Sequence, residues 1–246
     1  MNKITKLSWD TKFFGFGVGK ISAHELTQEE LEKMRQAMLA MNIKLVYCFI
    51  DPRDTISSRN LKKENYKMVD EKITFEMRLG NVNEEISGSI SSYINKQINK
   101  RLISLALQSG EYSRFKIDKH FSQDSFEKLY TTWLENSLNN KLAKDVLVYS
   151  ENGQEAGLIT LGEKNNHADI GLLAVDEEYR GRGIGKKLLH AAFLKARELG
   201  FSQIQVVTQK QNKGACLFYK KMGFIPERVE NIYHIWLNQT AYENSF

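Results

Sequence analysis

The feature that most constrains this chain is a turn rich in glycine and arginine at residues 180–185, Arg-Gly-Arg-Gly-Ile-Gly. The stretch before it, 168–175, has the pattern of a strand, and residues 184–199 have that of an amphipathic helix ending at Gly200. Alternate glycines let the backbone turn sharply and let a ligand approach without a Cβ atom in the way. The first N–H groups of a helix lack partners within it and lie at the positive end of its dipole, so the turn predicts a diphosphate site.

Two other nucleotide-binding turns are excluded by the residues that follow. A P-loop requires Ser or Thr after Gly-Lys, whereas Lys187 and then Leu188 occupy those positions here. A Rossmann turn requires a further glycine at a fixed spacing and an acidic residue at the end of the next strand, where Gln209 lies instead. A purely structural turn is disfavoured because residues 180–186 hold three glycines and three cations, Arg180, Arg182 and Lys186.

A second glycine run, residues 15–20 (Gly-Phe-Gly-Val-Gly-Lys), repeats the spacing of the first. It is followed by the strand-like pair Ile21-Ser22, and the next helix begins only at about Thr27. Without a helix start beside it, the run has no anion site. We therefore expect it to form a strand.

Composition places the chain among ordinary soluble globular proteins, with 41% hydrophobic and 26% charged residues. The longest apolar run near the start, Leu45–Ile50, is far too short to cross a membrane, and residues 1–6 lack an apolar signal segment. These features predict a cytoplasmic protein that does not engage a membrane.

Charge and cysteine content narrow the partners. The net charge of +5 comes from scattered lysines, which argues against nucleic acid and favours an anionic small molecule. Cys48 and Cys216 both lie among apolar or aromatic neighbours, which predicts reduced core thiols. No metal is expected, because soft or imidazole ligands at suitable spacing are lacking.

Two stretches of the chain share one plan of helix, strand, helix and strand. This likeness predicts a weak internal duplication, with a smaller degenerate lobe at 1–80 and a main domain at 81–246, joined through the polar segment 81–92. The expected order of elements indicates an α+β fold with a mixed sheet. The expected helices are 27–41, 61–64, 94–107, 126–138, 184–199 and 214–222, and the expected strands are 45–50, 72–77, 146–149, 155–161, 168–175, 204–208 and 232–237.

The turn and its flanks resemble the signature of the Gcn5-related N-acetyltransferases. Arg180-x-x-Gly183-x-Gly185 follows the strand end 172–175, and residues 212–224 resemble the second motif of that family. The resemblance implies a mostly antiparallel sheet flanked by helices, and attack of a neutral amine on the thioester of acetyl-CoA. It further implies that acetyl-CoA contacts Leu173, Ala174, Val175, Arg180, Gly181, Arg182, Gly183, Ile184, Gly185, Lys186, Asn212 and Phe218.

Two residues are candidates for proton transfer in such a reaction. Tyr219 matches the position of the family's general acid, and a tyrosine is protonated at neutral pH. The alternative is a core tyrosine, since apolar residues share its helix face. Asp169 lies where some family members carry a catalytic glutamate; the alternatives are a solvated strand residue and a base role filled by a water chain. Leu61, the matching position in the first lobe, cannot donate a proton, so that lobe is expected to be catalytically empty.

Five further motifs point to the acceptor: Trp9-Asp10-x-x-Phe13-Phe14-Gly15, Ser113-Arg114-Phe115, Tyr130-x-x-Trp133-Leu134-Glu135-Asn136, Ile170-Gly171-Leu172-Leu173 and Thr208-Gln209-x-x-Asn212. They resemble the bacterial dTDP-fucosamine acetyltransferases of surface-polysaccharide synthesis. This closer resemblance implies an amino-sugar nucleotide as the small-molecule substrate, with Arg114, Phe115, Trp133 and Asn136 as candidates to bind it. Helix packing is the alternative role for Trp133. Three alternative functions stay open: acetylation of another small amine, acetylation of a protein amine, and acyl-CoA binding without activity. A homodimer is also possible.

Overall fold

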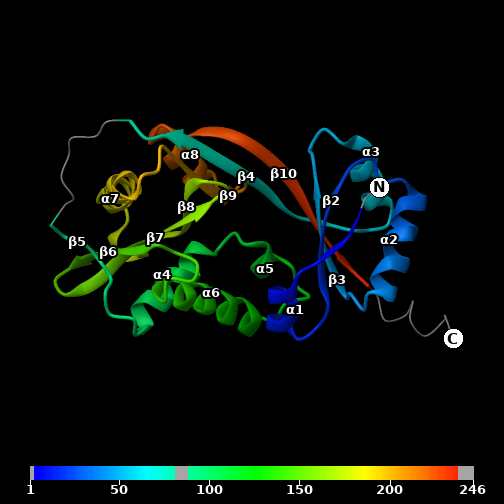
Figure 1. Ribbon diagram of the computed structural model, residues 1–246, viewed down its shortest axis with the longest axis horizontal. Helices are drawn as coiled ribbons and strands as arrows, with labels where there is room; N and C mark the ends of the chain where they lie inside the picture. The colour runs from blue at the N-terminus through cyan, green and yellow to red at the C-terminus, as the bar shows by residue number, and fades with distance from the viewer. Residues whose placement is uncertain (1–2, 81–87, 238–246) are drawn as a thin grey trace. The chain divides into compact units, whose positions relative to one another are not determined.

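A computed structural model describes residues 3–80 and 88–237, which form two compact units (Figure 1). The first unit comprises Met1–Lys72 together with Val229–Phe246, and the second comprises Ile73–Arg228. The chain thus passes between the units inside two strands, a division that differs from the expected single boundary at residue 80. The C-terminal strand belongs to the first unit because it pairs with a strand near the start of the chain, a long-range contact that no local pattern reveals.

The first unit is built on a sheet of strand order β1-β2-β3-β10. β2 and β3 are parallel, and β1 and β10 are each antiparallel to their neighbour. The elements of this unit are β1 (Thr5–Lys6), α1 (Ser8–Phe14), β2 (Val18–Ala23), α2 (Gln28–Ala40), β3 (Leu45–Ile50), α3 (Thr55–Lys63), the start of β4 (Met68–Arg78) and most of β10 (Ile225–Trp236).

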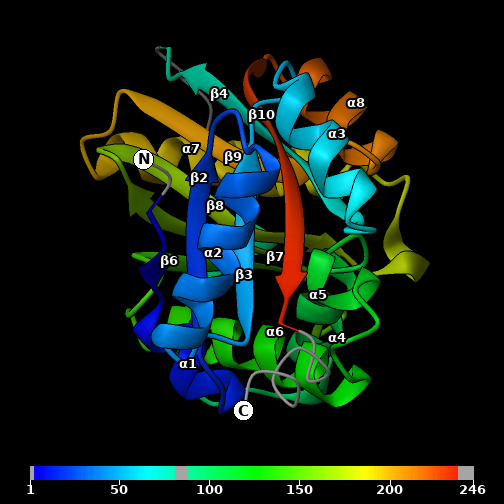
Figure 2. The same ribbon diagram turned by 90° about the vertical axis from the view of Figure 1, so that its right-hand side faces the viewer.

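Helix α2 covers one face of this sheet, lying over β2 and β3 (Figure 2). It starts where expected because the Thr27 hydroxyl accepts the backbone N–H of Glu30, which caps the first turn. Its apolar side chains, Leu31, Met34 and Met38, are buried against alternate residues of β3. The period of the helix and the alternation of the strand therefore meet in one apolar core.

The early glycine run is only partly a strand, which corrects the expectation for residues 15–20. Gly15 ends α1 with a left-handed φ of +75°, and β2 begins only at Val18. A Cβ atom at Gly17 would overlap the backbone carbonyl of Asn42. These glycines thus serve a helix end and a close backbone approach.

The two cysteines differ in burial, which leads to a testable difference in reactivity. Cys48 is fully buried in β3, and burial raises the pKa of its thiol to about 12. Cys216, in helix α8 (Lys213–Lys221), is only half-buried. Because the thiolate is the reactive form, we expect a disulfide reagent to modify Cys216 alone in the native protein, and both thiols in urea. Rapid reaction of both thiols in the native protein, measured by absorbance, would contradict the burial assigned to Cys48.

The second unit has the strand order β4-β9-β8-β7-β6-β5. The pairs from β5 to β8 are antiparallel and β8–β9 is parallel, so the sheet is mixed and mostly antiparallel, as the sequence predicted. The elements are β5 (Ile90–Ser92), α4 (Lys100–Ser109), α5 (Arg114–Ile117), α6 (Gln123–Leu138), β6 (Asp145–Glu151), β7 (Gln154–Lys164), β8 (His167–Val175), η1 (Glu177–Tyr179), α7 (Ile184–Glu198), β9 (Gln203–Gln209) and α8 (Lys213–Lys221).

Helices cover both faces of this sheet. Figure 1 shows α7 on one side of β6, β7 and β8, and α4 with α6 on the other. The first helix of the unit begins six residues later than the expected Ile94, at Lys100, because the Asn99 side chain accepts the backbone N–H of Leu102 and caps the helix there. Ile94 itself is 90% exposed. Of the expected linker 81–92, residues 81–87 lie outside the described residues, and its end forms β5.

Neither a membrane-spanning helix nor a metal site is found among the residues described. Across 3–80 and 88–237, no helix is long and apolar enough to cross a membrane. In the same ranges, no group of three histidine, cysteine, aspartate or glutamate side chains could hold a metal ion.

Candidate active site

The second unit contains a cleft of about 700 Å³ beside the turn singled out in the sequence. Its walls come from the end of α4, the last residues of β8, the turn before α7, and the first turns of α8. Nine of the residues expected to act on acetyl-CoA line it: Leu173, Ala174, Val175, Arg180, Gly181, Gly185, Asn212, Phe218 and Tyr219.

The wall formed by β8 has backbone N–H and C=O groups without strand partners on the side toward β9, because β8 and β9 separate. Their parallel pairing joins Ala168–Ile170 to Ile204–Val206, and in the described structure it extends no further, although β8 continues to Val175. A strand edge with open N–H and C=O groups is a template for hydrogen bonding to an extended ligand. The edge at 171–175 therefore suits a ligand that carries amide groups.

A bulge in β8 lies where the two strands separate. Ile159 of β7 pairs with Leu173, whereas Leu161 pairs with Ile170, so two residues of β8 lie opposite one residue of β7. A bulge bends its strand and changes the direction of the groups that follow. Here it precedes the part of β8 that lines the cleft.

The turn between β8 and α7 has the geometry of an anion site. Gly181 and Gly183 adopt left-handed φ values of +79° and +75°, which side chains rarely tolerate. Gly183 is the N-cap of α7 and supplies no side chain to cap the helix, so the first-turn N–H groups stay open to a ligand. These groups and the dipole of a 15-residue helix favour a phosphate at this point.

Both arginines of the turn are held by the protein. Arg180 donates from Nε to the Val175 carbonyl oxygen at 3.0 Å and from Nη2 to Gln108 Oε1 at 2.9 Å. Arg182 pairs with Glu151 Oε1 at 3.2 Å, and its guanidinium lies over the ring of Tyr179. Arg180 lines the cleft and Arg182 does not, so Arg180 is the better placed of the two to meet a diphosphate.

Buried Asp176 ties this turn to α4. Its carboxylate accepts from Arg101 Nη1 at 3.3 Å and from Gln108 Nε2 at 3.4 Å, and it also accepts the backbone N–H of Glu178. Gln108 in turn accepts from Arg180. The network fixes the turn against the opposite wall of the cleft.

Tyr219 lies at the inner end of α8, with only 6% of its surface exposed. Its ring packs against Phe218, Phe224 and Phe75 at centroid distances of 5.4, 5.6 and 6.0 Å. Burial, with a smaller contribution from Cys216, raises the pKa of the hydroxyl above its ordinary value. Tyr219 is therefore both a core residue and part of the cleft wall, and its hydroxyl stays protonated at neutral pH.

Asn212 opens α8 as its N-cap. Its Oδ1 accepts the backbone N–H of Ala215 at 3.1 Å, which leaves the amide Nδ2 group as the side chain's donor toward the cleft. The same side chain thus starts the helix and can anchor a ligand.

Four predicted contacts do not line the cleft: Arg182, Gly183, Ile184 and Lys186. Ile184 is a core residue, 2% exposed, whose side chain lies against Gly157 of β7. For Gly183 and Ile184, only backbone groups remain available to a ligand. Lys186 is exposed and adds positive charge on the first turn of α7.

Asp169 also lies outside the cleft wall. The half-buried carboxylate accepts a hydrogen bond from Gln205 Nε2 at 2.7 Å across the β8–β9 pair. This contact gives Asp169 a structural role in holding the two strands together.

Three of the four candidate acceptor residues pack together at the α5–α6 junction, and none of the four lines the cleft. Phe115 is buried and meets the ring of Trp133 edge-on at 6.0 Å. The Arg114 guanidinium lies over the Phe115 ring at 4.5 Å, and the backbone carbonyl of Asn136 accepts from Lys141. The side chains of Arg114, Phe115 and Trp133 thus form one packed cluster.

The cleft wall from α4 was missed in the sequence. Gln108, Glu111 and Tyr112 line it, and Tyr112 is 41% exposed. The available signal is Gly110, which ends α4: a Cβ atom there would overlap the ring of Tyr130. A glycine that ends a helix, followed by a carboxylate and an exposed aromatic residue, marks a loop able to face a ligand.

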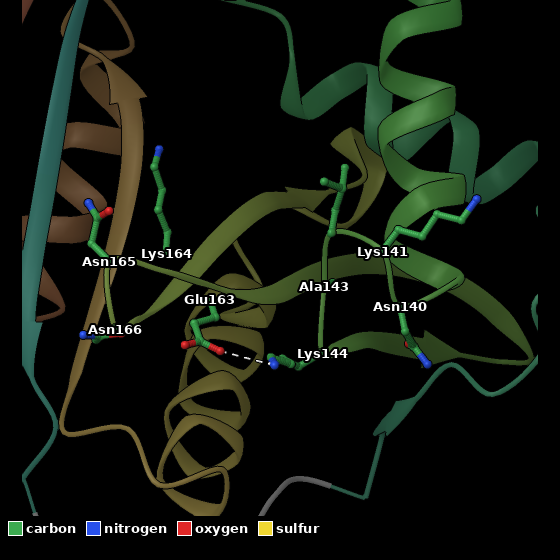
Figure 3. A pocket seen from close by; sticks show the side chains of 9 residues that line it. Asn140, Lys141, Ala143, Lys144, Glu163, Lys164, Asn165 and Asn166 are labelled. Atoms are coloured by element: carbon green, nitrogen blue, oxygen red, sulfur yellow. Dashed lines mark ion pairs between the residues drawn. The ribbon is translucent and has the colours of Figure 1, made fainter. Parts of the chain in front are cut away.

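A second hollow, of about 380 Å³, lies between the loop after α6 and the β7–β8 hairpin (Figure 3). Lys144 pairs with Glu163 across it at 3.2 Å. Figure 3 shows the amino groups of Lys141 and Lys164 pointing away from one another. The cations therefore do not converge on a ligand, and we assign no site here.

Residues 107–224 match the acetyltransferase (GNAT) family, a range that includes every wall of the cleft. The fold agrees: the structure of a GCN5-related N-acetyltransferase from Sphaerobacter thermophilus superposes with a TM-score of 0.57 at 14% identity, covering 90% of this chain and 73% of that one. The acetyltransferase-type sheet expected from the sequence is thereby confirmed.

Two similar proteins differ in what they are named for. The spore coat polysaccharide biosynthesis protein SpsD of Bacillus subtilis (strain 168) is 28% identical over 140 residues, 57% of this chain and 48% of SpsD. N-alpha-acetyltransferase 30 of Saccharomyces cerevisiae is 39% identical over 70 residues, 28% of this chain and 39% of that protein. The chain thus aligns with less than half the length of each.

Proposed function

We propose that this chain is an acetyltransferase of the GNAT type and that it transfers the acetyl group of acetyl-CoA to the amine of a dTDP-4-amino-4,6-dideoxy sugar for surface-polysaccharide synthesis. The donor half of the proposal rests on one observation. The cleft joins an open strand edge, a helix N-terminus without a side-chain cap, and a buried tyrosine hydroxyl in a single unit.

Each part of the cleft suits one part of acetyl-CoA. The open edge of β8 at 171–175 fits the amides of the pantetheine arm. The turn at 180–185, with Arg180, fits the diphosphate, and Asn212 supplies a further amide donor. These assignments make acetyl-CoA the co-substrate of the cleft and require no metal.

The reaction then proceeds by direct transfer. The neutral amine attacks the acetyl carbon, a C–N bond forms, and a backbone N–H of β8 stabilises the oxyanion of the tetrahedral intermediate. Collapse of the intermediate breaks the C–S bond. The departing sulfur takes a proton from the Tyr219 hydroxyl, the surplus proton of the amine passes to water, and solvent returns a proton to Tyr219.

Two observations support the acceptor. SpsD is named for polysaccharide biosynthesis, and the residues that carry the sequence resemblance to amino-sugar acetyltransferases lie in both units. The described cleft adds Glu111 and Tyr112 as groups that can meet an acceptor, a carboxylate for an amine and an aromatic face for a ring. Arg114, Phe115, Trp133 and Asn136 do not line this cleft, and in this proposal they stay candidates to bind the part of the acceptor that lies beyond it.

A protein amine is the second candidate. The observation that favours it is the likeness to N-alpha-acetyltransferase 30, which is confined to 28% of this chain. A cleft of about 700 Å³ has to hold the donor as well as the reacting amine, so the rest of the acceptor, sugar nucleotide or peptide, lies beyond it.

A panel of amines separates these candidates. We expect thiol release from acetyl-CoA to be fastest with a dTDP-4-amino-4,6-dideoxy sugar, because the Glu111 carboxylate and the aromatic face of Tyr112 suit an amine carried on a ring. The panel also includes peptides with free N-termini, simple amino sugars and polyamines, and kcat/KM is determined for each amine with the same precision. Turnover of peptides alone would replace the leading acceptor by the second, and the absence of turnover with every nucleotide sugar would remove it.

A further inference from the structure

The β8 bulge is held by a side chain of the neighbouring strand. Thr160 of β7 is the residue that lies alone opposite Gly171 and Leu172. Its Oγ1 accepts the backbone N–H of Leu172 at 2.8 Å, and the bond is buried. A bulge interrupts the hydrogen-bond ladder of a sheet, and a buried N–H without a partner is costly. The threonine hydroxyl thus replaces the ladder bond lost at the bulge.

Gly171 completes this arrangement. A Cβ atom at Gly171 would lie 2.9 Å from Thr160 Oγ1, closer than such contacts are found in proteins. A side chain at Gly171 would therefore displace the hydroxyl or the strand. The contact between Thr160 and Leu172 depends on a glycine at this position.

The contact coincides with the parting of β8 and β9. The β8–β9 pairing ends at Ile170, the bulge follows, and Leu173 is the first residue of β8 that lines the cleft. Thr160 itself is 2% exposed and does not line the cleft. Any influence of its hydroxyl on chemistry must pass through the backbone of β8.

We propose that Thr160 is a positioning residue for acetyl transfer: its hydroxyl sets the bend of β8 that aims the Leu173 backbone at the thioester carbonyl. The inference rests on the proposed function, in which that backbone polarises the carbonyl. In this proposal a buried residue outside the cleft influences kcat. Substitutions at Thr160 leave the turn proposed to bind the CoA diphosphate intact, so the affinity for acetyl-CoA should not depend on them.

Two substitutions at one position test this role. Thr160→Val keeps the shape and removes the acceptor, whereas Thr160→Ser keeps the hydroxyl. We expect Thr160→Val to lower kcat by about tenfold to 100-fold, since misdirection of one oxyanion donor approaches the cost of removing it. Thr160→Ser should restore kcat to within about threefold, and the acetyl-CoA dissociation constant should change little in either variant. Thiol release is measured with whichever amine the parent protein acetylates fastest, so the result does not depend on the acceptor's identity.

Amide exchange gives a reading that is independent of turnover. The Leu172 N–H should exchange faster in Thr160→Val than in the parent or in Thr160→Ser, measured by NMR. Thr74→Val, at a buried threonine of β4 in the same unit, is the matched control and should alter neither kcat nor Leu172 exchange. If Thr160→Val fails to fold, Gly171→Ala serves in its place, with the same fall in kcat expected.

The outcomes separate the two claims. A Thr160→Val kcat equal to that of Thr160→Ser and Thr74→Val overturns the positioning role even if acetyl transfer is confirmed. A parent protein that acetylates no amine overturns the proposed function instead, and Leu172 exchange then still decides whether Thr160 holds the bulge.

Discussion

Tyr219→Phe is expected to lower kcat by about 100-fold or more while leaving the acetyl-CoA dissociation constant within about threefold of the parent value. The ring would keep its packing against Phe75, Phe218 and Phe224, and only the hydroxyl would be lost. In the proposed mechanism the hydroxyl supplies the proton to the departing sulfur, so its loss should affect the transition state and not the bound ground state. Steady-state thiol release and calorimetric titration with acetyl-CoA measure the two quantities.

The pH dependence sharpens this expectation. Burial raises the pKa of the Tyr219 hydroxyl, so the proton donor is fully present below its ordinary value of about 10 and is lost only above it. We expect kcat of the parent to rise as the amine deprotonates and then to stay level to about pH 10. A fall beginning near neutral pH would implicate another acid.

A matched control distinguishes chemistry from packing. Tyr130→Phe removes a hydroxyl from another buried tyrosine, 6% exposed, in the same unit. Its stability is compared with that of Tyr219→Phe by thermal unfolding, and its kcat should equal that of the parent. Equal kcat values for both variants and the parent would leave Tyr219 as a core residue only.

Most of the cleft lining could be predicted because its parts are close together in the sequence. Strand β8, the glycine turn and α7 are consecutive, and each has a local signal: an apolar run, positive-φ glycines, and a 3.6-residue period. The observed helix starts at Ile184, the residue expected from that period. Local sequence signals therefore predicted most of the residues that line the cleft.

Features that depend on long-range pairing could not be predicted. The division of the chain depends on β10 pairing with β3, about 180 residues away in sequence, and the strand pattern alone does not choose a partner. Similarly, the aromatic residues at α5 and α6 have the composition of a ring-binding site, yet their rings pack against one another in one cluster. Composition does not reveal whether an aromatic face is turned to a ligand or to its neighbours.

Helix boundaries shifted where a single polar side chain intervened. Asn99 caps α4, so that helix begins later than expected. The Asp54 side chain accepts the backbone N–H of Ser57 and caps α3, which therefore begins at Thr55 and not at the expected residue 61. Both are residue types that favour the cap position. The apolar period alone located these helices but not their first residues.

Gly183→Glu is expected to weaken acetyl-CoA binding by about 100-fold or more. Gly183 lies at the N-cap of α7 with a φ of +75°, and the proposed diphosphate lies at this helix end. A carboxylate about 5 Å from a phosphate charge costs roughly 3 kcal/mol at an effective dielectric of about 20, and every 1.4 kcal/mol corresponds to about tenfold in affinity. Calorimetric titration with acetyl-CoA measures the loss.

Gly153→Glu is the matched control, because Gly153 in the turn between β6 and β7 has the same φ of +75° and equally open surroundings. Both variants place the same side chain in the same strained backbone region, so their thermal stabilities should fall by similar amounts. Only Gly183→Glu should lose affinity for acetyl-CoA, and the loss should shrink at high salt as the charges are screened. Equal affinities for the two variants would mean that the diphosphate binds elsewhere, and a loss that is insensitive to salt would point to blocked space in place of repelled charge.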